Sequence, residues 1–245
     1  MVRTRLETFT ILCTVGALCA ASCALPAQDA RTTRASGDEL EAFRKKTPVT
    51  EAVDRALDYL ARVQLPDGSW SSGYDGSTGV VSAALLAFLA SGHPPGPGKH
   101  GKAVERGLRW VLASRQPDGL LAYPATWRPM YSHGMSTLLL GEVFGMVDED
   151  HPGFEGFEET YRKAVELILR AQNVPKAPAE VGGWRYEASS ADSDLSVVGW
   201  QLLALRAAFS NGLAVPRNSI DAAVQYIKRC AAPEGIGIIG SLTPI

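Results

Sequence analysis

Two carboxylates precede a long apolar run in the second half of the chain. Asp192 and Asp194 stand directly before the segment 195–205. A carboxylic acid at the head of such a helix can donate a proton if a dry cavity keeps it protonated. The same position suits an N-cap, whose carboxylate bonds free amides and meets the positive end of the helix dipole. Capping lowers the pKa, so the two roles require opposite electrostatics.

Aromatic side chains and one histidine are the candidates for ligand contact. The π faces of Trp and Tyr can stabilise a cation in an apolar pocket, although the same residues also pack in cores. His133, with Glu142 further along, lies in a second apolar run, where it bonds near the helix start or faces a cavity. The candidate ligand-binding residues are Trp127, Tyr131, His133, Trp184, Tyr186 and Trp200.

Two-helix units recur along the chain and would position these residues. Apolar residues spaced three and four apart predict a first helix over 50–63 with one apolar face, and the run from Thr78 predicts a partner that is buried on most sides. The pair recurs at 104–146 and 161–211, and 220–230 resembles the first helix again. Gly212 is expected to close the third partner helix in a left-handed conformation. A period of about fifty residues predicts a helical-hairpin repeat.

A glutamine–glycine–tryptophan turn follows the first outer helix. Its sequence is Gln64-x-x-Asp67-Gly68-Ser69-Trp70, and Gln116 and Gln172 begin looser versions. The Gln amide can bond exposed carbonyls, Gly supplies a positive φ, and Trp can lie over the amide plane. We expect these turns to clamp neighbouring outer helices.

The turn from Gln64 to Trp70 resembles the QW motif of terpene cyclases. The alternation of outer and inner helices resembles the α/α toroid of squalene–hopene cyclases and protein prenyltransferase β subunits. The segments 182–205 and 131–137 are similar to exported bacterial, planctomycete-type proteins of the prenyltransferase/squalene-oxidase repeat family. The resemblance covers roughly residues 50–235 and implies an all-α, terpenoid cyclase-like toroid.

The resemblance also implies roles for particular residues. Class II cyclases protonate an alkene with an Asp-x-Asp-Asp motif, which places Asp194 as proton donor, but Leu195 replaces the final Asp. The prenyltransferase zinc site needs Asp, Cys and His from inner helices, whereas Cys230 falls on an outer helix. We therefore expect no metal and no cofactor.

The first residues read as an export signal. Arg3 and Arg5 precede an uncharged apolar run at 9–21, which predicts a signal peptide over 1–24. Alternatively, Ala20-Ala21-Ser22-Cys23 resembles a lipobox and would place a lipid anchor on Cys23. A polar tether over 25–46 and a repeat domain over 47–245 follow. The expected location is periplasmic or cell-envelope, and the lone domain cysteine, Cys230, excludes an internal disulfide.

The expected ring is incomplete, with about seven helices and an open flank at its last hairpin. A formal net charge of −2 and 46% hydrophobic residues give no sign of a nucleic-acid partner. We expect a non-catalytic binding or scaffold module at the cell envelope; the alternative is a class II terpene cyclase-like enzyme. The expected partners are an apolar isoprenoid-like ligand, an envelope protein, or a second copy bound through the open flank.

Overall fold

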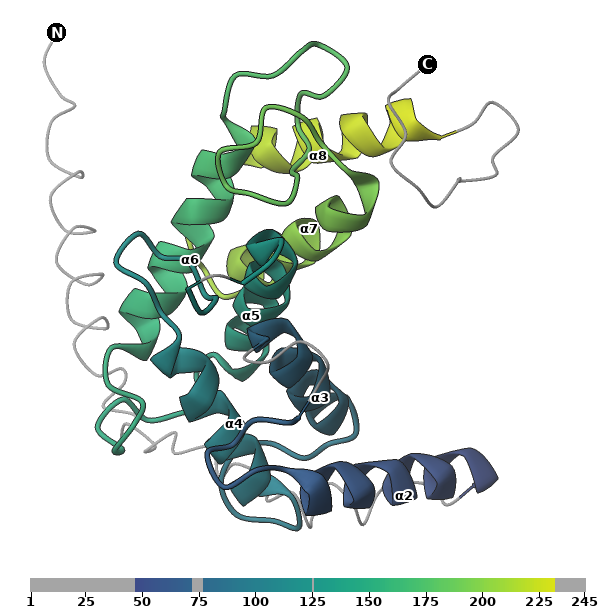
Figure 1. Cartoon of the computed structure of the whole chain (residues 1–245), viewed down its shortest axis with the longest axis vertical. Helices are drawn as coiled ribbons and strands as arrows, with labels where there is room; N and C mark the ends of the chain where they lie inside the picture. Colours follow the sequence, from purple (N-terminus) through teal and green to yellow (C-terminus); the bar gives the residue numbers. More distant parts are fainter. Residues whose placement is uncertain (1–46, 72–76, 125, 232–245) are drawn as a thin grey trace, which may run out of the picture. The chain divides into compact units, whose positions relative to one another are not determined.

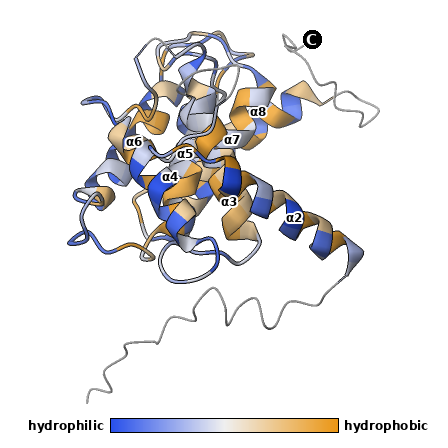
Figure 2. Cartoon of the chain, turned by 60° about the horizontal axis from the view of Figure 1, so that its bottom comes forward, coloured by the Kyte–Doolittle hydropathy of each residue, from blue (hydrophilic) through white to orange (hydrophobic). Residues whose placement is uncertain are grey.

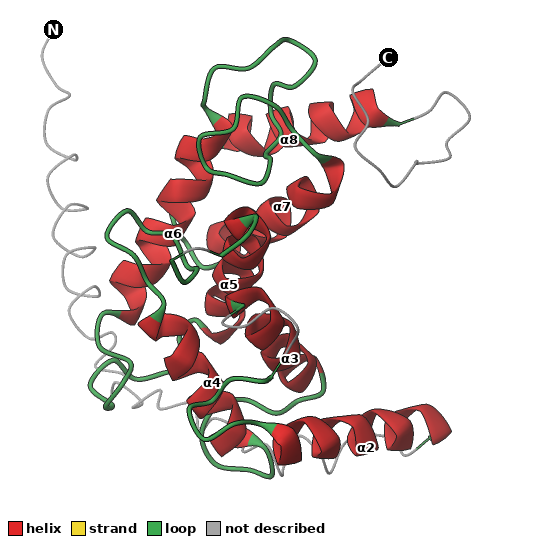
Figure 3. Ribbon diagram, viewed as in Figure 1, coloured by secondary structure: helices red, strands yellow, loops and turns green. Residues whose placement is uncertain are grey.

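A computed structural model describes residues 47–71, 77–124 and 126–231, which are all-helical apart from one isolated bridge between Arg115 and Leu121 (Figures 1 and 3). These three ranges contain seven helices: α2 (Pro48–Val63), α3 (Thr78–Ala90), α4 (Gly101–Ala113), α5 (Pro129–Val143), α6 (Phe157–Gln172), α7 (Leu195–Ser210) and α8 (Arg217–Cys230). The all-α prediction is confirmed. The predicted signal peptide, the lipobox at Cys23, the tether and the apolar C-terminal stretch lie outside the described residues.

The helices form two classes that alternate along the chain. The inner helices α3, α5 and α7 pack against one another in succession, and the outer helices α2, α4, α6 and α8 pack on them (Figure 1). The inner helices are apolar on most sides, whereas each outer helix has one apolar side, so blue and orange residues alternate along α2 (Figure 2). The chain is thus a helical hairpin repeat, as its periodicity predicts.

Local sequence signals set the helix boundaries. Thr47 and Thr50 form a capping box at the start of α2, and Ser77 caps α3 by accepting from the Val80 amide. Gly212 has a φ of +83° after α7, which confirms its predicted left-handed conformation. The helix expected from Tyr161 begins one turn earlier, at Phe157, where two glutamates in the first turn favour the positive end of the dipole.

Small residues let the inner helices approach closely. A β-carbon at Gly79 would lie 3.0 Å from Ser132 Oγ, and the hydroxyls of Ser82 and Ser136 are 2.9 Å apart. Between α5 and α7, Gln201 donates to the Met130 carbonyl at 2.7 Å. Short side chains and the buried hydrogen bond from Gln201 therefore fix how the inner helices pack against one another.

A glycine turn after each of three outer helices docks on the backbone of the next outer helix. Gly68, Gly119 and Gly182 have φ values of +98°, +97° and +93°. Added β-carbons would overlap the carbonyl oxygens of Arg106, Lys163 and Ala222 respectively. Glycine is needed twice over, for the left-handed backbone and for the close approach.

The glutamines of two turns strengthen this docking. Gln64 Nε2 donates to Gly68 O at 3.0 Å and to Ala103 O on α4 at 2.9 Å. Gln172 Nε2 donates to Gly182 O and Ser219 O at 2.9 and 2.8 Å. The amide of Gln116 donates instead to Ala122 O, within its own turn. Two of the three glutamines therefore link consecutive outer helices as predicted, whereas the prediction is wrong for Gln116.

Tryptophan anchors the first and third turns to their own outer helices. Trp70 donates its indole N–H to Leu60 O and Trp184 to Ile168 O, both at 2.8 Å. Leu121 occupies this place in the second turn and has no such donor, but its own amide donates to the ring of His133. The three turns thus share a backbone geometry that different side chains support.

Helix α7 carries exposed apolar side chains. Phe209 is 64% exposed and Leu203 46%. A hollow of about 440 Å³ lies between α7 and α8 and is lined by Leu202, Phe209, Val215 and Ile220, among others. Within the described residues, no helix has the length and apolar character to cross a membrane.

Gly182 and Gly212 provide a matched test of the glycine docking. Both have a positive φ, but a methyl group at Gly212 would meet no atom within 4 Å. We expect Gly212→Ala to lower the free energy of unfolding by about 1 kcal/mol and Gly182→Ala by about 1–3 kcal/mol more, measured by urea denaturation. Equal losses would show that the close approach to Ala222 contributes nothing.

Candidate functional site

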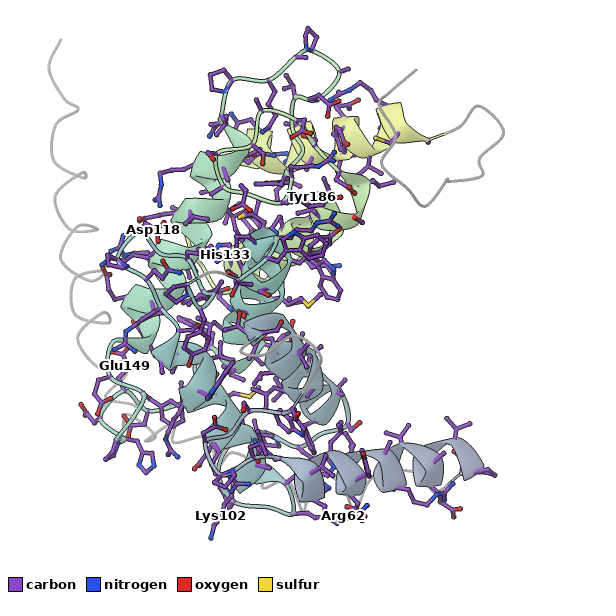
Figure 4. The ribbon with its side chains drawn as sticks, in the orientation of Figure 1. Arg62, Lys102, Asp118, His133, Glu149 and Tyr186 are labelled. Atoms are coloured by element: carbon purple, nitrogen blue, oxygen red, sulfur yellow. The ribbon has the colours of Figure 1, made fainter. Side chains whose placement is uncertain are left out.

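The N-terminal ends of α5 and α7 bring most of the candidate residues together. The segment 182–194, the second part of the connection between α6 and α7, passes the start of α5, where the Met130 amide donates to Tyr186 O at 3.1 Å. At its end, the Asp194 amide donates to Trp184 O at 2.8 Å. Figure 4 shows Tyr186 in this region and His133 on α5. These backbone bonds fix the side chains described below.

Asp194 is the N-cap of α7. Its Oδ1 accepts from the Ser196 amide at 2.9 Å and from the Ser196 hydroxyl at 2.6 Å. Its Oδ2 accepts from the Tyr186 hydroxyl at 3.0 Å, and the side chain is buried. Every contact at this carboxyl is a donor, which is the arrangement that an ionised carboxylate requires.

The electrostatics of Asp194 agree with that geometry. Burial raises its pKa, but the bonds from Ser196 and Tyr186 outweigh burial and hold the pKa below its ordinary value of 3.8. The hydrogen bond to this carboxylate in turn raises the pKa of the Tyr186 hydroxyl. Of the two roles that the sequence left open, the geometry favours the cap, because a proton donor needs a raised pKa.

Asp192 lies on the surface. Its side chain is 56% exposed and pairs with Arg185 at 3.3 Å. An exposed pair of this kind has a small energetic effect. Asp192 and Asp194 therefore do not form a buried pair of carboxyl groups.

The Arg128 guanidinium is held between two aromatic rings. Its Cζ lies 3.8 Å from the ring centre of Trp127 and 4.1 Å from that of Tyr186. Arg185 approaches Tyr186 at 4.5 Å, and the rings of Tyr131 and Tyr186 stack with centres 5.8 Å apart. We call Trp127, Arg128, Tyr131, Arg185 and Tyr186 the aromatic–arginine cluster. Cation–π contacts of this type fix the cation without using its N–H donors.

The backbone at Arg128 is also unusual. Its φ of +54° is the only positive φ of a non-glycine residue within the described ranges. Such a conformation costs about 1–3 kcal/mol, and the following Pro129 restricts Arg128 further. Strain of this size is often found where a side chain must point to a ligand.

Tyr131 connects the cluster to the start of α7. Its hydroxyl is 2.5 Å from Ser196 Oγ, which links α5 to the cap of α7. Tyr131 and Tyr186 are half-buried, and Trp127 is 70% exposed. Trp200, also half-buried, lies beside Gly134 and is not part of the cluster. The cluster therefore offers aromatic surface to a molecule arriving from solvent.

His133 is placed away from this cluster. It is fully buried, its Nδ1 accepts from the Leu121 amide at 3.1 Å, and its Nε2 lies 3.2 Å from Ala164 O. A neutral imidazole with its proton on Nε2 satisfies both bonds. Burial lowers the pKa of His133 to about 4. Both ring nitrogens are already hydrogen-bonded within the chain, so neither is available to a ligand.

Trp184 is likewise internal, with 1% of its side chain exposed and its indole N–H bonded to α6. The structure therefore brings Trp127, Tyr131, Tyr186 and Asp194 together and places His133 and Trp184 in the packing between helices. Among the described residues, no group of three or more His, Cys, Asp or Glu side chains is arranged to hold a metal ion.

Arg128, Arg185 and Ser196 belong to the site, although the sequence analysis does not select them. A signal for the arginines was present, because Arg follows Trp in both Trp127-Arg128 and Trp184-Arg185. Ser196 had no comparable signal, since it takes part only through the cap and the Tyr131 hydroxyl.

No protein-family model matches the chain, and no curated protein matches it.

His133 should give the stability of the fold a distinct pH dependence. Its pKa is about 4 in the folded chain and 6.5 in the unfolded one. The unfolded state therefore takes up a proton first, so this stability is complete above pH 6.5, falls between pH 6.5 and 4, and is constant below. The full change corresponds to about 3 kcal/mol.

The test compares the wild type with His133→Gln. We expect the free energy of unfolding of the variant to change less between pH 6.5 and 4, measured by urea denaturation at several pH values. Equal slopes for the two proteins in that window would contradict a neutral, buried His133.

Asp194 should behave as a cap in mutants. We expect Asp194→Ala to lower the free energy of unfolding by about 1–2 kcal/mol, because the Ser196 amide loses its acceptor. Asp194→Asn keeps an oxygen for that amide and should lose less. An increase in stability on Asp194→Asn at neutral pH would instead indicate a carboxyl that is unfavourably charged or held protonated.

Proposed function

We propose that the chain is an exported, terpene cyclase-like repeat protein that acts as a non-catalytic binding module at the cell envelope. Its ligand site is the aromatic–arginine cluster. The observation that carries the proposal is the Arg128 guanidinium, which two rings hold in place and which forms no hydrogen bond or ion pair through its N–H groups with any described residue. The turn sequences and the alternation of outer and inner helices support the family assignment.

The cluster fits a ligand with an acidic group. A guanidinium fixed before binding loses little freedom when it bonds an anion, and its planar donors match phosphate or carboxylate oxygens. The N-terminal end of α5 also favours an anion, because the helix dipole is positive there and no side chain caps the helix. The acidic group would lie near Arg128, on the side that the rings leave open.

The rest of the ligand would be apolar. Tyr131, Met135 and Leu138 recur at helical spacing on one side of α5, and each is half-buried. We propose that these side chains, together with Trp127 and Tyr186, contact the apolar part of the ligand. An isoprenoid-like molecule with a phosphate or carboxylate head matches both parts.

Proton-transfer catalysis of the cyclase type receives no comparable support. Asp194 is bonded as a carboxylate and has a lowered pKa, whereas an alkene-protonating acid needs the opposite. Leu195 stands where the cyclase motif has its last Asp. We therefore propose that the region around Asp194 binds a ligand and does not protonate it.

Farnesyl phosphate and farnesol are a matched pair of probes, because they differ in the acidic group alone. We expect farnesyl phosphate to bind more tightly by roughly tenfold or more, measured by isothermal titration calorimetry below the micelle concentration. Arg128→Met, which keeps the apolar stem, should abolish the difference between the two probes. Arg217→Met serves as control because its side chain is 93% exposed and lies on another helix.

Two results would contradict the proposal. One is equal affinity for the two probes in the wild type, which would remove the role of the acidic group. The other is an unchanged preference in Arg128→Met, which would place the anion site elsewhere.

A further inference from the structure

The first outer helix carries an exposed apolar stripe. Val49, Tyr59 and Val63 are 72%, 54% and 38% exposed, and Ala52 and Ala56 between them are exposed as well. Their spacing places all five on one side of the helix. We call these five residues the α2 stripe; α2 is labelled in Figure 2.

The matching positions on the other outer helices are covered. The repeats align Ala56 with Gly107, Ala164 and Ala223, each of which is buried. On α6 all five positions are buried: Phe157, Thr160, Ala164, Leu167 and Ala171. On α4 the buried ones are His100, Ala103, Gly107 and Ser114, and Trp110 is half-buried. On α8 the buried ones are Ser219, Ala223, Tyr226 and Cys230, with Pro216 exposed.

The preceding repeat covers these positions, and it does so with its glycine turn and its inner helix. On α4, Gly68 lies against Arg106 and Gly107, and Leu85 of α3 lies against Gly107. On α8, a β-carbon at Gly183 would lie 3.1 Å from the Tyr226 ring. A stripe of this type therefore accepts a glycine turn followed by apolar side chains.

A further segment of the sequence resembles the three glycine turns that dock in the structure. Pro233-Glu234-Gly235 matches Pro66-Asp67-Gly68 and Pro117-Asp118-Gly119, and Gly235 follows Ala223 by the same interval as Gly68 follows Ala56. The apolar residues Ile236, Ile238, Ile239 and Leu242 come next. Residues 233–245 lie outside the described ranges, so their part in the inference rests on sequence.

We propose that residues 233–245 of a second copy of this chain dock on the α2 stripe and join the copies head to tail. Within one chain, α2 and α8 stand at opposite ends of the succession of packed helices (Figure 1), which favours a partner chain as the source of the turn. The contact is heterologous, so each copy offers a donor turn and an acceptor stripe. It does not involve the aromatic–arginine cluster.

The proposed junction between copies lacks the glutamine hydrogen bonds that two of the turns make within the chain. Ala231 stands where Gln64 and Gln172 stand in their turns, so no side-chain amide clamps the second copy. The junction is therefore weaker than the internal docking, and copies associate reversibly.

Sedimentation velocity of the full chain over a range of concentrations up to about 0.1 mM tests the proposal. We expect the wild type to associate with rising concentration. Ala56→Glu in the acceptor stripe, or Gly235→Val in the donor turn, should raise the dissociation constant by roughly tenfold or more. Ala87→Glu is the matched control, since Ala87 is also an exposed helical alanine but lies outside the stripe. Circular dichroism verifies that all variants fold.

Mixing the two variants tests the direction of the contact. Ala56→Glu keeps an intact donor and Gly235→Val an intact acceptor, so an equimolar mixture should recover a heterodimer that neither variant forms alone. A wild type that stays monomeric at all concentrations, association unaffected by Ala56→Glu, or a mixture that stays monomeric would each overturn the proposal. Farnesyl phosphate binding by Ala56→Glu, compared with the wild type, separates failure of the junction from failure of the ligand site.

Discussion

The close contact between a left-handed glycine and the backbone of the next outer helix sets the spacing of the whole repeat. At Gly68, Gly119 and Gly182 the chain reverses and meets a carbonyl oxygen of the following outer helix. Because a β-carbon fits at none of these places, backbone atoms set how closely each turn approaches the next outer helix. The supporting side chains differ between turns. Trp70 and Trp184 donate from their indoles in the first and third turns, and His133 accepts from the backbone of the second.

The candidate site depends on that spacing. The glycine turn at Gly182 begins the segment that carries Tyr186 and Asp194 to the heads of α5 and α7. The same segment caps α7 and supplies one of the rings beside Arg128, so the fold and the proposed ligand site share their residues. An ionised Asp194 serves both purposes, because it stabilises the helix and orients the Tyr186 hydroxyl. Helix capping and the placement of the Tyr186 ring therefore depend on the same carboxylate.

Much of the fold followed from the sequence, and the reasons differ by residue. Helical periodicity and the glycine turns gave the order of the helices, and Gly212 and Asp194 lie where local capping rules place them. The burial of His133 could not be predicted, because its partners Leu121 and Ala164 belong to other elements. The position of Arg128 could not be predicted for a similar reason, because its contact with the Tyr186 ring joins segments that are far apart in the chain.

The protonation state of Asp194 tests the central claim, that this site binds and does not transfer protons. A carbon-13 NMR titration of the Asp194 side-chain carboxyl, assigned by comparison with Asp194→Asn, measures its pKa directly. The hydrogen bonds from Ser196 and Tyr186 predict a value below the ordinary 3.8. A pKa near or above neutrality, about 7 or higher, would contradict the cap and identify Asp194 as a carboxylic acid poised to donate a proton.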